Sequence, residues 1–142
     1  MTTLEHIHLV QKLIQVFTLS LERRGQEHDQ DKLSCPALSG DNLSEITYGS
    51  QEYKDALIAL TEPLNAHYAA NRHHPQHFPD GVRGMNLVDL VEMFLDWYAA
   101  CRRHNDGDIR KSIQINEDRF DIPPVLSDIF RNTVQFLEEH DV

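Results

Sequence analysis

The chain has 142 residues, 9 histidines and a formal net charge of −10, a size that suits one domain over residues 1–142. The acidic balance argues against an extended nucleic-acid surface, which needs clustered lysine and arginine. No apolar run approaches the roughly 20 residues that cross a bilayer, and the start lacks a signal peptide's basic and apolar regions. With only two distant cysteines, Cys35 and Cys101, the sequence predicts a reduced, cytoplasmic protein without a membrane partner.

The first predicted helix covers residues 3–24 and ends at Gly25. Apolar residues recur along it at spacings of three and four: Ile7, Val10, Ile14, Phe17 and Leu21. At ~100° per residue, His6 lies within about 40° of the centre of this stripe, whereas His8 lies nearly opposite. The pattern therefore predicts that His6 points into the protein and that His8 points to solvent.

The remaining elements follow from apolar spacing and from the positions of proline and glycine. They are, in chain order, a short helix or turn at 28–32, a loop at 34–49, a helix at 50–72 with a possible bend at Pro63, a loop at 73–84, and helices at 86–104, 108–118 and 123–139. No segment shows the alternation of a strand. The predicted fold class is all-α, a compact bundle of about five to six helices.

The helix predicted at 50–72 carries a stripe whose character changes along its length. It begins with leucines and ends with metal-ligand or hydrogen-bonding side chains: Leu57, Leu60, Leu64, His67, Asn71 and His74. Two more imidazoles, His73 and His77, accompany this end of the stripe. Either the helix ends at a polar cavity, or its end is a hydrophilic terminus where histidine is favoured by the helix dipole.

The helix predicted at 86–104 is largely apolar except for a narrow polar strip of Asp89, Glu92, Asp96 and Arg103. Three carboxylates at these spacings repel one another unless a cation or base lies among them. The strip is therefore either the solvated side of the helix or one wall of a site, and the sequence leaves both interpretations open.

The pair His28-Asp29 can offer a divalent metal one imidazole nitrogen and one carboxylate oxygen. With His6 before it and an aspartate on a later helix, the pair resembles the HD-domain metal-dependent phosphohydrolases. The resemblance implies an HD-like fold and metal ligands from His6, His28, Asp29 and a final aspartate, Asp89 or Asp96. The neighbouring His73-His74 is similar to the extra pair of HD enzymes that hold two metals. Asp31 stands where those enzymes have glycine.

The chain also resembles an uncharacterised, often phage-encoded family, and that resemblance covers nearly the whole sequence. Its recurrent pieces are a His-Asp pair with a nearby Lys, an Asn-x-His-His-Pro segment, an Asp-Leu-x-Glu-Met-x-x-Asp-Trp helix, and a Ser-Ile-x-x-Asn-x-x-Phe-like stretch. Here they fall at residues 28–32, 71–75, 89–97 and 112–120. This second resemblance implies a fold but no substrate.

The HD resemblance implies hydrolysis of a small phosphoester, most plausibly a nucleotide, by water activated on one or two ions of Mn, Fe, Co, Ni, Zn or Mg. Catalytic roles would then fall to Asp29, Glu92 and His67. Substrate contacts would come from Lys32, Asn71, Arg103, Lys111 and Asn116. Two alternatives stay open: an HD-type di-iron oxygenase, and a non-catalytic helical module that binds metal or nucleotide.

Overall fold

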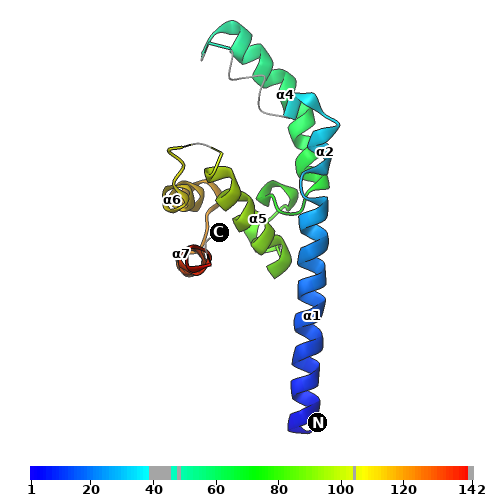
Figure 1. The fold of residues 1–142 in the computed structure, drawn as a ribbon. Helices are drawn as coiled ribbons and strands as arrows, with labels where there is room; N and C mark the ends of the chain where they lie inside the picture. The colour runs from blue at the N-terminus through cyan, green and yellow to red at the C-terminus, as the bar shows by residue number, and fades with distance from the viewer. Residues whose placement is uncertain (39–45, 48, 104, 141–142) are drawn as a thin grey trace. The chain divides into compact units, whose positions relative to one another are not determined.

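The structure is a computed structural model that describes residues 1–38, 46–47, 49–103 and 105–140 (Figure 1). These residues form α-helices and short 3-10 helices and include no strand, so the predicted all-α class is confirmed. No helix in the described ranges is long and apolar enough to cross a membrane. The chain divides into two units, Met1–His77 and Phe78–Val142. The single-domain organisation stays a prediction.

The first unit begins with α1, a helix of 25 residues from Thr3 to Glu27. Thr2 and Glu5 form a capping box at its start, because each side chain accepts a hydrogen bond from the other residue's backbone N–H. The helix passes through Gly25, so the predicted stop at this residue is wrong. One glycine costs a helix only about 1 kcal/mol relative to alanine, which a long helix can accommodate.

The surface of α1 is not covered by the rest of its unit. None of its residues is buried, and every residue from Met1 to Leu19 is exposed. The predicted apolar stripe is present, but no other described segment of Met1–His77 covers it. His6 is exposed within its own unit, and its predicted inward orientation stays a prediction, because helical spacing identifies an apolar face without specifying what packs on it.

The rest of the first unit consists of α2 (Gln30–Leu33), η1 (Pro36–Leu38), α4 (Gln51–Ala70) and η2 (Pro75–His77). Ser50 caps α4 by accepting a hydrogen bond from the backbone N–H of Tyr53. Only three described residues of this unit are buried: His67, His73 and Pro75. The interior of the unit is thus a group of histidines rather than a cluster of aliphatic side chains.

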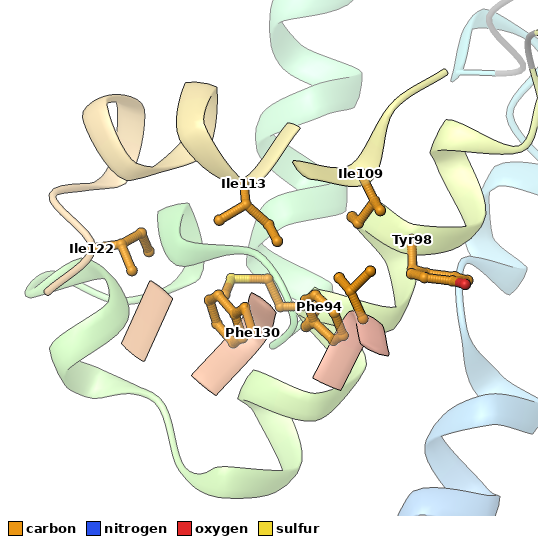
Figure 2. Close-up of a cluster of buried hydrophobic side chains, with 8 residues drawn as sticks. Phe94, Tyr98, Ile109, Ile113, Ile122 and Phe130 are labelled. Carbon is orange, nitrogen blue, oxygen red and sulfur yellow. The ribbon is translucent and has the colours of Figure 1, made fainter. Parts of the chain in front are cut away.

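The second unit has a conventional hydrophobic core (Figure 2). Its elements are η3 (Gly81–Gly84), α5 (Leu87–Cys101), α6 (Ile109–Phe120) and α7 (Pro124–Glu139). Eight buried apolar side chains fill the core: Met93, Phe94, Tyr98, Ile109, Ile113, Ile122, Phe130 and Val134. The rings of Phe94 and Phe130 stack with centroids 5.0 Å apart, and this contact joins α5 to α7.

Candidate metal centre

Two junctions in the first unit bring ligand-type side chains together. Asp29 separates α1 from α2 and has left-handed backbone angles, φ 53° and ψ 18°. Aspartate tolerates this conformation better than most residues do. The last turn of α4 supplies His67, and the chain then turns after Asn71 to supply His73 and His74. Residues some 40 positions apart are thereby placed around one point.

Four side chains each offer one donor atom to this point: Asp29, His67, His73 and His74. The four atoms all lie within 4.8 Å of one another. Asp29 Oδ1 lies 3.4 Å from His67 Nε2 and 3.4 Å from His73 Nε2. His67 Nε2 lies 2.8 Å from His74 Nε2. We call these four residues the histidine cluster.

These separations and donor types fit a divalent transition metal. Donors held about 2.0–2.1 Å from one ion lie roughly 2.9–3.4 Å apart, depending on whether they subtend an octahedral or a tetrahedral angle. The three distances in the cluster fall close to this range. Three imidazoles with one carboxylate suit Mn, Fe, Co, Ni or Zn better than Ca or Mg, which prefer oxygen donors. The residues present therefore fit such an ion.

Two neighbours of the cluster orient its ligands. His67 Nδ1 donates to Asp31 Oδ2 at 2.7 Å, so the ring presents Nε2 to the cluster. The side-chain amide of Asn71 donates to the same Asp31 oxygen at 3.1 Å. Lys32 Nζ donates to Asp29 Oδ2 at 2.6 Å, which leaves Asp29 Oδ1 facing the imidazoles. Asp31 thus holds His67, and Lys32 holds Asp29, through the side-chain atom that faces away from the cluster.

The electrostatic surroundings keep both carboxylates ionised. Burial opposes the charge on Asp29, but contacts with His73 and Lys32 and the positive field of His28 outweigh it and hold the pKa well below its ordinary value. For Asp31, partial burial is likewise outweighed by the hydrogen bond and charge of His67, and the pKa is again lowered. An ionised Asp29 is the form that a metal ion binds.

The sequence model of one protein family matches residues 1–140, which is nearly the whole chain. That family is described as a family of unknown function, DUF5662. The chain belongs to DUF5662. No curated protein and no solved structure matches this DUF5662 chain. The geometry of the first unit is what indicates the chemistry of its centre.

The structure of the DUF5662 chain separates two residues that the sequence predicted as ligands of one ion. His6 lies near the N-terminal end of the continuous helix α1 and His28 is its C-cap, so about 33 Å of helix lies between them. One ion cannot bind both within a single chain. His28 lies beside the histidine cluster, with its ring centroid 4.5 Å from that of His73. Its predicted role as a ligand stays a prediction.

Two predicted substrate contacts of the DUF5662 chain are already engaged within the first unit. Lys32 forms an ion pair with Asp29. Asn71 donates to Asp31 and to the carbonyl oxygen of His67. In this arrangement both residues support the ligands of the cluster, and their predicted contacts with a substrate stay predictions.

The other predicted site residues of the DUF5662 chain lie in the second unit: Asp89, Glu92, Asp96, Arg103, Lys111 and Asn116. Asp89 is buried and accepts from the backbone N–H of Asn86 at 3.0 Å in a capping box. Glu92 and Asn116 are also buried, whereas Arg103 and Lys111 are exposed. The roles predicted for these residues at a metal or substrate site stay predictions.

The sequence did not reveal the role of Asp31. This residue drew attention only because it stands where the HD enzymes have glycine. The contact partners of Asp31, His67 and Asn71, are 36 and 40 residues away along the chain. The available signal was the four-residue spacing of His67 and Asn71, which places both on one face of α4.

Proposed function

We propose that this DUF5662 protein is a divalent-metal-dependent phosphohydrolase that acts on a small phosphoester, with nucleotides as the first candidates. The observation that carries the proposal is the convergence of one carboxylate and three imidazoles from Asp29, His67, His73 and His74. Two of the four, His67 and His73, are buried at 2% and 1% exposure. A metal ion bound among these imidazoles would use their lone pairs.

The residues of the cluster would hold the ion, and Asp31 and Lys32 would fix the orientation of two of them. When bound, the ion would lower the pKa of a coordinated water and polarise a phosphoryl oxygen. The net charge of −10 makes a large polyanion an unfavourable partner but leaves a small phosphorylated molecule possible. The resemblance of His28-Asp29 and Lys32 to the HD phosphohydrolases supports the same reaction class.

The first test is the metal content of protein purified without added metal. We expect at least one equivalent of a transition metal in the wild type and a clear loss in Asp29→Asn and in His73→Gln. His8→Gln, an exposed histidine on α1, is the matched control and should retain the metal. A metal content that is the same in all four proteins would contradict the proposed centre.

The second test is turnover of nucleotides and phosphomonoesters in the presence of Mn, Co, Ni, Zn or Mg. Hydrolysis by the wild type that disappears in Asp29→Asn supports the phosphohydrolase proposal. Metal binding without hydrolysis of any compound would argue against it. Two redox-active irons for each chain would favour the oxygenase alternative.

A structural metal is a second candidate, and a specific observation favours it. The buried side chains described in the first unit are two cluster histidines and one proline, so this unit has little apolar burial to hold it together. A bound ion would join the α1–α2 junction to the end of α4. If a chelator unfolds α1 and α4 in circular dichroism and no substrate is hydrolysed, the ion has a structural role.

A further inference from the structure

The exposed apolar surface of α1 is unusual for a helix of a folded protein. Nine large apolar side chains on this helix are between 39% and 61% exposed: Leu4, Ile7, Leu9, Val10, Leu13, Ile14, Val16, Phe17 and Leu19. No other described segment of Met1–His77 packs on this helix of 25 residues, and most helical stability in proteins comes from tertiary packing. The apolar side of α1 therefore needs a partner.

The spacing of these residues indicates what kind of partner fits. Ile7, Val10, Ile14, Phe17 and Leu21 are separated by three, four, three and four residues. This period of 3.5 matches the seam of a two-stranded coiled coil, in which the a and d positions of a heptad face a second helix. By the same count, Leu4 and Leu13 fall at the positions that flank the seam.

We propose that α1 pairs with α1 of a second copy of this chain, and that the protein is a homodimer. A second copy supplies a helix of the same length and the same period, which is what a self-complementary twofold interface requires. The proposal is independent of the metal centre, because neither the seam nor its flanks include a residue of the histidine cluster.

The size of the surface agrees with a dimer of modest affinity. Full burial of one such side chain removes on the order of 100 Å² of apolar surface from water, and the six exposed ones at the seam and its flanks are about half exposed. Two copies would then bury roughly 600 Å² of apolar surface and, with the polar share, about 1,000 Å² in total. That total is near the lower limit for a specific interface, so the dimer should dissociate at micromolar concentrations.

Charge favours an antiparallel pair. The next seam position after Leu21 is Arg24, and a parallel pair in register would place two Arg24 guanidinium groups opposite each other. An antiparallel pair separates them by about 25 Å along the axis. It also pairs Ile14 with Phe17 and Val10 with Leu21, so that a larger side chain meets a smaller one in each layer.

Sedimentation analysis of the full chain from about 5 μM to about 500 μM tests the proposal. We expect the wild-type mass to rise from 16.4 kDa toward twice that value. Ile14→Glu, in the seam, should stay monomeric over the whole range. Gln15→Glu adds the same charge one position away, outside the seam, and should dimerise as the wild type does.

A wild type that is monomeric at the highest concentration would overturn the proposal, since either the Phe78–Val142 unit or a different protein would then cover α1. Dimerisation of Ile14→Glu with wild-type affinity would also overturn it. If Ile14→Glu does not fold, the thermal midpoint of the wild type decides: a rise with protein concentration supports the dimer, and a constant midpoint refutes it.

Orientation is tested by cysteine crosslinking in a chain whose Cys35 and Cys101 are replaced by serine. The double variant Ile7→Cys, Arg24→Cys should form a covalent dimer under oxidation, and neither single variant should. A crosslink between two copies of the Ile7→Cys single variant would refute the antiparallel arrangement.

Discussion

The hydrogen bond from His67 Nδ1 to Asp31 gives the most direct test of how the centre is built. Asp31→Asn keeps the size of the side chain but removes its charge. A hydrogen bond to a charged acceptor contributes about 1.5–3 kcal/mol, and one to a neutral acceptor about 0.5–1.5 kcal/mol. Because the Asp31 side chain is 37% exposed, we take the lower part of the difference between these two contributions, about 1 kcal/mol. This corresponds to roughly fivefold weaker metal binding, just below the roughly tenfold effect at the lower end for such partners.

Competition titration with Zn²⁺ or Co²⁺ measures the affinity, and ¹⁵N spectra of the imidazoles report the tautomer of His67. We expect the wild type to carry its proton on Nδ1 and Asp31→Asn to show a mixture of tautomers. Asp55→Asn is the matched control, because Asp55 lies on the exposed surface of α4 and accepts a hydrogen bond from the side-chain amide of Gln51. An affinity within twofold of the wild type, together with an unchanged tautomer, would refute the reasoning.

Two further predictions concern the second unit. Ile113→Ala, at a position 1% exposed, should lower the free energy of unfolding by about 2–5 kcal/mol, whereas Ile115→Ala on the same helix, at 57% exposure, should change it by less than about 1 kcal/mol in urea titrations. The hydrogen bond from Arg110 lowers the pKa of Glu138. Because the pKa is lower in the folded state, this contact stabilises the fold above the ordinary carboxyl pKa and is lost as the pH falls. NMR titration should show the low pKa, and Arg110→Gln should restore its ordinary value.

The starts of the helices could be predicted well from the sequence, because they depend on local chemistry. Ser50, Asn86 and Asp108 cap the starts of α4, α5 and α6, each within one residue of the predicted start. Prolines 123 and 124 likewise mark the start of α7. Capping residues and prolines act over three or four positions, so a single sequence contains the information.

The candidate site was harder to predict, because it depends on contacts between distant segments. The change from leucine to histidine along α4 did identify His67, Asn71 and His74, which the structure brings together. The orientation of His6 depends on contacts of this kind too, since an apolar stripe does not specify whether its partner lies in the same unit. The role of Asp31 was equally hidden in the sequence, because its contact with His67 forms only when α2 packs against the end of α4.

The left-handed backbone of Asp29 limits which amino acids this position can accept in related sequences. A residue there must adopt φ near 53° and also offer a ligand oxygen. Glycine adopts this backbone conformation but offers no ligand oxygen. Glutamate adopts the conformation less readily, and its longer side chain would place the carboxylate elsewhere. Asparagine satisfies the backbone but gives up the charge. Sequences that retain the centre should therefore vary at position 29 far less than at Gln30 and Leu33, the two exposed positions of α2, and loss of the aspartate should accompany loss of the cluster's histidines.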